Sequence, residues 1–296
     1  MGRQRVLWAR FRGYAPLDYR PVASPGVASV FFEPAGPGTF QATAATAGPW
    51  YPGAQHGGPP SALAAWALET HDPDPRQRLG RVTVDILRPV PVGRLSLRTR
   101  TVRAGRRIAL VETVMEADGQ EVLQARGWRI ERPAGEVPEI TDGSGGPESV
   151  PESGAGLPPH IFRDHQDGYL GMIEWRFLAA GLDEPGGEPG KPGPVRSAWA
   201  RPRIPLLPDE EPSAMSRTLL VADTGSGIGA TLPISEYVFI NVDLTVVLPR
   251  DPAGEWIRLE SSTMIGADGT GLATTRLHDQ LGSIGTGWQT LLVAPR

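Results

Sequence analysis

Apolar and polar residues alternate along most of the chain, and one helical segment interrupts this alternation in each half. In the first half, six segments carry the β-branched and apolar residues that are typical of strands. They are residues 28–33, 39–44, 81–90, 94–103, 106–117 and 120–131. The turn sequences RAGR and ADGQ separate the last three segments. The pattern therefore predicts a run of antiparallel strands.

The segment between the second and third of these strands has a different pattern. It covers residues 56–71 and has the sequence HGGPPSALAAWALETH. Pro59 and Pro60 stand near its start, where a helix tolerates proline, and good helix formers follow. Because apolar residues lie on nearly all sides of this helix, we expect it to be buried rather than laid on a surface.

The second half repeats the same order of elements. Its strand-like segments are residues 172–178, 196–204, 236–249, 255–266, 271–280 and 283–293. A helix is predicted over residues 212–223, with Ser213 as its N-cap. A GW pair recurs at Gly127–Trp128 and Gly287–Trp288, and an aspartate, Asp118 or Asp279, lies nine or ten residues before each tryptophan. The chain therefore contains an internal repeat.

Residues 133–159 are rich in Pro, Gly, Ser and Glu, which is typical of a linker. We therefore predict an N-terminal unit over residues 1–132, a linker over 133–160 and a C-terminal unit over 161–296. Each unit has strands, one buried helix and a further run of antiparallel strands. A sheet wrapped around a central helix is the hotdog arrangement, so the expected fold is an α+β double hotdog.

Composition narrows the class of protein. The chain has 296 residues, of which 40% are hydrophobic and 21% are charged, as in soluble globular proteins. The net charge of −4 gives no general attraction to nucleic acid. The absence of cysteine excludes disulfides, thiolate metal sites and cysteine nucleophiles. No apolar run approaches the roughly 20 residues that span a bilayer, and no secretory signal is visible, so we expect a cytoplasmic protein.

Three motifs carry a resemblance to a known family. In chain order they are HGGPPSALAAWALE, VDILRPVPVG and HDQLGSIGTGWQTLLV. Together they resemble the thioesterase-like double-hotdog proteins of the acyl-CoA thioesterase II type, over about residues 29–293. The resemblance implies hydrolysis of an acyl-CoA or related acyl thioester, no cofactor, no metal and a possible homo-oligomer.

The resemblance also implies a catalytic set of an Asp, a Ser or Thr, and a Gln on three strands of the second hotdog. Carried over to this chain, these are Asp243, Ser262 and Gln289, with Ser261 or Thr263 as alternatives for the hydroxyl. Asp243 would accept a proton from water, and the other two would orient that water. If the strand alternates strictly, Asn241 and Asp243 lie on one face, which would be the polar face of a pocket.

Asp85 is the repeat counterpart of Asp243, but the residue that corresponds to Gln289 is Arg129. Because the catalytic set is not duplicated, we expect chemistry at Asp243 and a structural role for Asp85. At the start of the first helix, Gly57 and Gly58 would let an acyl thioester approach closely. His56 is a candidate for substrate contact, although a role in helix entry is the stronger expectation.

Other motifs give little. GSGIGA at Gly225 resembles a dinucleotide loop, but Pro233 follows too soon for the helix that such a loop requires, and a loop after a helix is expected instead.

Fold resemblance alone does not fix the reaction. A hydratase, dehydratase or cyclase that uses Asp243 as acid or base stays open, as does an acyl-binding protein without catalysis.

Overall fold

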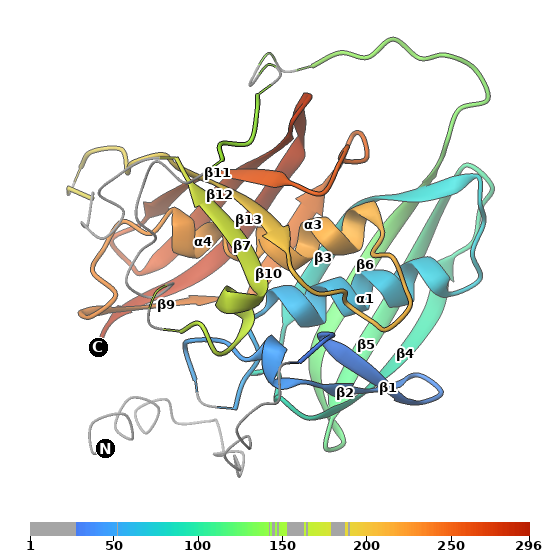
Figure 1. Ribbon diagram of the computed structural model, residues 1–296, viewed down its shortest axis with the longest axis horizontal. Helices are drawn as coiled ribbons and strands as arrows, with labels where there is room; N and C mark the ends of the chain where they lie inside the picture. The colour runs from blue at the N-terminus through green and yellow to red at the C-terminus, as the bar shows by residue number, and fades with distance from the viewer. Residues whose placement is uncertain are drawn as a thin grey trace.

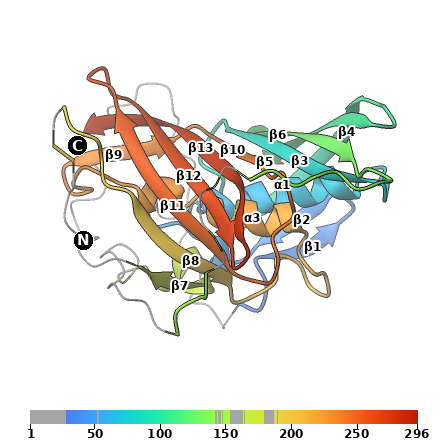
Figure 2. The same cartoon turned by 90° about the horizontal axis from the view of Figure 1, so that it is seen from above.

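The computed structural model describes residues 28–51, 53–141, 143, 146, 148–152, 163, 165–178, 187–188 and 190–296. Its described strands form one antiparallel sheet that curves around the helices (Figures 1 and 2). The strands of the first half are β1 Phe32–Gly36, β2 Thr39–Ala42, β3 Gln77–Ile86, β4 Arg94–Arg103, β5 Ile108–Ala117 and β6 Gln120–Glu131. Those of the second half are β7 Ile173–Phe177, β8 Arg196–Pro202, β9 Tyr237–Asn241, β10 Asp243–Val247, β11 Ile257–Ile265, β12 Thr270–Asp279 and β13 Gly282–Pro295.

Each half of the chain contributes half of the sheet, and corresponding strands of the two halves occur in the same order from the edge of the sheet to its centre. The path runs β1-β2-β4-β5-β6-β3 and continues as β10-β13-β12-β11-β8-β7, while β9 pairs with β13. The two halves join where β3 pairs with β10, in a register that sets Asp85 opposite Asp243. Asp85 is exposed there. Residues far apart in the sequence thus form the centre of the sheet.

Within the described residues, three helices lie inside this curved sheet. They are α1 Gly58–Thr70, α3 Ala214–Ala222 and the single-turn α4 Gly225–Ile228. Ten of the thirteen residues of α1 are buried, so the predicted buried helix is confirmed. The side chain of Ser213 accepts the N–H of Ser216 over 3.0 Å, which confirms the predicted N-cap of α3. The helices α1 and α3 pack against each other in the centre of the molecule (Figure 1).

Two sequence predictions about local structure need correction. The loop expected at GSGIGA is instead the short helix α4, which follows α3 after a break at Asp223 and Thr224. The single strand expected over 236–249 is divided at Val242 into β9 and β10. β9 pairs Asn241 with Leu291, and β10 pairs Thr245 with Trp288. The segment that joins β9 to β10 therefore has one residue more than the facing part of β13, and this extra residue makes a β-bulge.

The turn between β5 and β6 forms as the sequence ADGQ predicts. Asp118 has a φ of 49° and Gly119 a φ of 74°, the left-handed pair that a two-residue hairpin favours. The described part of the predicted linker contains no helix or strand. Two short 3-10 turns, η2 Ala44–Thr46 and η3 Tyr169–Met172, lie beside each other.

Candidate active site

The end of α3 lies against the start of α1, and glycine is required at this contact. A Cβ atom on Gly57 would lie 2.7 Å from Oδ2 of Asp223, and a Cβ on Gly58 would collide with the carbonyl oxygen of Leu220. A side chain at either position would push the two helices apart. The two glycines therefore bring the first half of the chain into direct contact with Asp223 in the second half.

Asp223 is the centre of a cluster of buried polar side chains. It is 5% exposed and forms the C-cap of α3. Its Oδ1 accepts the Nδ2–H of Asn241 over 2.8 Å and the Nε2–H of Gln289 over 3.2 Å. Its Oδ2 lies 3.0 Å from Nδ1 of His56. Three strands or loops thus supply partners to one carboxylate.

Gln289 is held by both ends of its amide. It lies on β13 and is 1% exposed. Its Nε2 donates to the backbone oxygen of Asp223 over 3.0 Å, and its Oε1 accepts the N–H of Ser226 over 3.0 Å. Because the donors and the acceptor are all engaged, the amide has a single orientation. Gln289 therefore fixes the break between α3 and α4.

The β-bulge at Val242 decides which polar residue joins the cluster. Asn241 pairs with Leu291, so it shares the inner face of the sheet with Gln289. Beyond the bulge, Asp243 is bonded to Thr290, whose backbone N–H donates to Oδ1 over 2.5 Å and whose hydroxyl donates to Oδ2 over 3.1 Å. Because Thr290 follows Gln289 in a strand, its side chain lies on the opposite face. The carboxylate of Asp243 therefore accepts a backbone N–H at the bulge, and it faces away from Asp223.

A hydroxyl pair packs beneath α4. Ser261 is fully buried, and its Oγ lies 2.9 Å from Oγ1 of Thr275. A Cβ on Gly225 would collide with this Thr275 hydroxyl, so the pair sets the height of α4 above the sheet. Ser262 lies between the buried residues Ser261 and Thr263, so its side chain points to the other face of the sheet. Its partner on the neighbouring strand is Thr274.

The structure therefore brings only part of the predicted set together. His56, Gly57 and Gln289 lie around Asp223, and Gly58 follows them in α1. Asp243 and Ser262 both lie on the far face of the sheet, and neither contacts this cluster. The physical reasons are the bulge, which reverses the alternation after Val242, and the register of β11, which points Ser261 inward in place of Ser262.

Two residues of the cluster were not identified from the sequence. Asp223 ends a predicted helix, where an aspartate is unremarkable, and Asn241 stood on the same strand as the predicted Asp243. One signal was present: GSG after Asp223 marks a tight backbone approach. That signal gives no partner, because the partners come from positions 18 and 66 residues further along the chain.

His56 is buried between Asp223 and an aromatic ring. The imidazole stacks on the ring of Tyr169 with centroids 3.9 Å apart and planes tilted by 13°. The hydroxyl of Tyr169 donates to the carbonyl of Leu220 over 2.8 Å and lies 2.9 Å from Oγ1 of Thr224. Burial lowers the pKa of His56, and the charge of Asp223 opposes that effect. Burial also raises the pKa of Tyr169, so its phenol is neutral.

A small cavity of about 50 Å³ opens beside the cluster. Its polar lining includes His56, Asp223, Asn241 and Ser226, and its apolar lining includes Trp50, Leu170, Ile234 and Phe239. One water needs roughly 10–15 Å³ and two to four polar partners, so the cavity has room for a water. The first turn of α1 offers few donors here, because Pro59 and Pro60 lack N–H groups and Gly58 N–H points at His56.

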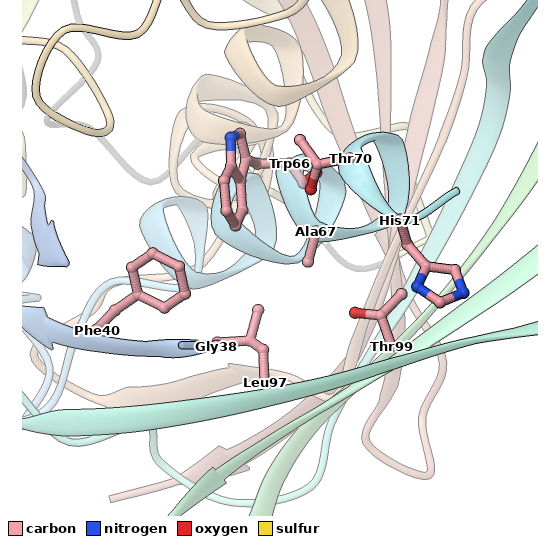
Figure 3. Close-up of a pocket in the computed structure, with 8 residues that line it drawn as sticks. All are labelled: Gly38, Phe40, Trp66, Ala67, Thr70, His71, Leu97 and Thr99. Atoms are coloured by element: carbon pink, nitrogen blue, oxygen red, sulfur yellow. The ribbon is translucent and has the colours of Figure 1, made fainter. Parts of the chain in front are cut away.

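A larger hollow of about 240 Å³ lies at the other end of α1 (Figure 3). It lies between that helix and β2 and β4, and its lining includes Phe40, Trp66, Leu97 and Thr99. Thr99 bonds Thr113 there over 2.9 Å, as Ser261 bonds Thr275 in the second half. The hollow contains none of the predicted site residues.

Two classes of site were searched for among the described residues. No group of three or more His, Cys, Asp or Glu side chains in those residues could hold a metal ion. Within the same part of the chain, no helix has both the length and the apolar character to cross a membrane.

Comparison with known proteins gives a consistent family. Models of the acyl-CoA thioesterase N-terminal and C-terminal domains match residues 46–130 and 147–293. No curated protein matches the chain significantly. Among solved structures, a protein suggested to be a thioesterase II from Thermobifida fusca YX has 15% identity and a TM-score of 0.66, with 90% of this chain and 96% of that chain covered.

Two further solved structures share the fold. The acyl-CoA thioesterase II TesB2 from Mycobacterium marinum has 15% identity and a TM-score of 0.60, over 88% of this chain and 92% of that one. A hotdog-fold protein of unknown function from Alicyclobacillus acidocaldarius has 16% identity and a TM-score of 0.62, over 87% and 93%. Both halves of the chain thus match domains of one family: the chain belongs to the thioesterase-like hotdog family.

Proposed function

We propose that the chain hydrolyses an acyl-CoA or a related acyl thioester with a water molecule activated by Asp223. The observation that carries this proposal is the convergence of Asp223, Asn241 and Gln289, from three separate elements, beside a cavity with room for water. Membership of the thioesterase-like family supports the same substrate class. Asp223 takes the place that the sequence suggested for Asp243.

Each member of the cluster has a distinct role in this mechanism. Asp223 accepts a proton from the water, whose oxygen then attacks the thioester carbonyl carbon. The amides of Asn241 and Gln289 both donate to Oδ1, which holds the carboxylate in one orientation beside the cavity where the water would lie. Gly227 lines the cavity beside these side chains.

We also propose that the two halves are two hotdogs, with boundaries near residues 1–132, 133–160 and 161–296. The identical strand order from each edge supports this division. So does the recurrence of a threonine or serine hydroxyl pair at Thr99–Thr113 and Ser261–Thr275. The active site then lies where the helices of the two hotdogs meet.

The experiment is release of free thiol from a panel of acyl-CoAs of different chain lengths, with the full chain as enzyme. We expect turnover on at least one member of the panel. Products with an intact thioester and an altered acyl chain would instead indicate a hydratase, dehydratase or cyclase. Retention of an acyl ligand with no turnover would indicate a binding protein. The homo-oligomer and the cytoplasmic location stay predictions, which sedimentation and cell fractionation can check.

A further inference from the structure

The Nδ1 atom of His56 lies within hydrogen-bond distance of two groups that need it in opposite states. The backbone N–H of Gly58 points at Nδ1 over 3.1 Å, which requires a lone pair on that nitrogen. Oδ2 of Asp223 lies 3.0 Å from the same atom, and an ionised carboxylate there requires a proton on the nitrogen. A ring nitrogen has either a lone pair or a proton. His56 therefore cannot satisfy Gly58 and an ionised Asp223 together.

Two arrangements resolve this conflict. In the first, Nδ1 carries a proton and donates it to the carboxylate of Asp223, and the N–H of Gly58 loses its partner. In the second, Nδ1 accepts the N–H of Gly58, and Oδ2 of Asp223 carries a proton directed at the ring. Each arrangement has one proton between Oδ2 and Nδ1. Without that proton, two lone pairs would face each other at 3.0 Å in a buried site, which is strongly unfavourable.

No other charged group in contact with His56 and Asp223 in the described part of the chain changes the number of protons between them. Among the described residues, the titratable groups in contact with His56 are Asp223 and Tyr169. The phenol of Tyr169 is neutral, because burial raises its pKa and its hydroxyl donates to a carbonyl. The side chains of Asn241 and Gln289, which bond the carboxylate, are uncharged amides. The proton is thus held by His56 and Asp223 alone.

We propose that His56 and Asp223 share this one proton, and that His56 decides when Asp223 can act as a base. The inference rests on the proposed function, and it gives the first half of the chain a role in the chemistry. In the competent form the proton resides on Nδ1, the ring has a bare Nε2, and Asp223 is ionised. When the pair takes up one more proton, Nε2 becomes protonated and the shared proton moves to Oδ2. Asp223 is then neutral and cannot accept a proton from water.

Hydrolysis balances with the pair in its competent form. A water proton passes to Asp223 as the water oxygen bonds to the carbonyl carbon. The carbon–sulfur bond then breaks, and the thiolate takes the proton from Asp223. The products are a free thiol and a carboxylic acid, and the pair returns to its first state. His56 acts through Asp223 and touches no reacting atom, so it is a positioning residue.

The test is the pH dependence of kcat/KM in the variant His56→Asn. The amide nitrogen of asparagine can replace Nδ1 as a donor to Asp223, but it takes up no proton. We expect the acid limb of the profile to move down by at least one pH unit, with the plateau rate within about tenfold of wild type. A lower plateau with an unmoved limb would mean a structural role only and would overturn the proposal. His71→Asn is the matched control, because His71 lies beside Asp72 at the far end of α1; its limb should stay in place.

A second measurement needs no turnover. Nitrogen-15 NMR of the full chain reports which ring nitrogen of His56 carries a proton. As the pH is lowered from neutral, we expect Nδ1 to change from protonated to bare in a single transition, with the reverse change at Nε2. An Nδ1 signal that stays constant across this range would also overturn the proposal. If the NMR transition is present and no thioester is hydrolysed, the proposed function fails while the shared proton stands.

Discussion

Replacement of Asp223 by asparagine separates the base proposed here from the one that the sequence suggests. The variant Asp223→Asn keeps the size of the side chain. Its amide oxygen can still accept the N–H groups of Asn241 and Gln289, which lie 2.8 and 3.2 Å from Oδ1. Its amide nitrogen can donate to Nδ1 of His56. The cluster therefore keeps its hydrogen bonds, and only the capacity to take a proton from water is removed.

The expected effect follows from that single loss. General base catalysis contributes about 10²–10⁴-fold to a rate. We expect kcat of Asp223→Asn to fall by that factor, with KM within about threefold and the thermal midpoint nearly unchanged. The assay is thiol release from the best acyl-CoA of the panel, followed at saturating and at low substrate.

The matched control is Asp243→Asn, on the other face of the sheet. Asparagine can keep both bonds to Thr290, so we expect turnover within about threefold of wild type and a stability loss of about 1 kcal/mol. Turnover above a tenth of wild type in Asp223→Asn would refute the assignment of the base. A hundredfold loss in Asp243→Asn with an intact fold would return the chemistry to the strand aspartate.

Three further outcomes are expected. Gly57→Ala should lower kcat at least tenfold, because its Cβ would lie 2.7 Å from Oδ2 of Asp223 and displace that carboxylate; steady-state kinetics checks this. Arg129→Gln should lower the free energy of unfolding by about 2 kcal/mol or more, since the guanidinium bonds the carbonyl of Leu68 in the last turn of α1 and those of His71 and Asp72 just after it, and should leave kcat per folded molecule unchanged. Burial raises the pKa of Glu69 to about 7, so its contribution to stability is present below pH 4.5 and is lost as the pH rises through 7. Glu69→Gln should therefore stabilise the protein by about 1–3 kcal/mol at pH 8 and by little at pH 4, in urea denaturation at both pH values.

Much of the fold could be predicted because it depends on local patterns. Strand alternation, proline at the start of α1, the Ser213 cap and the Asp118–Gly119 turn are each encoded within a few residues. The repeat was visible because both halves use the same order of such patterns. Gln289 was named from the family resemblance, and its place on the inner face comes from the register of β13 with β9.

The site itself depended on tertiary structure. Strict alternation sets Asn241 and Asp243 on one face, and a single extra residue at Val242 sends them to opposite faces. A bulge forms when the pairing with a partner strand demands it, and the partner here is β13, more than 40 residues away. Asp223 is a candidate base because the start of α1 packs against it: Gly57 and Gly58 allow the close contact that brings His56 to its carboxylate. The sequence by itself thus determined the elements and their order, whereas the packing of α1 on α3 and the register of β9 and β10 on β13 decided which carboxylate is buried beside its partners.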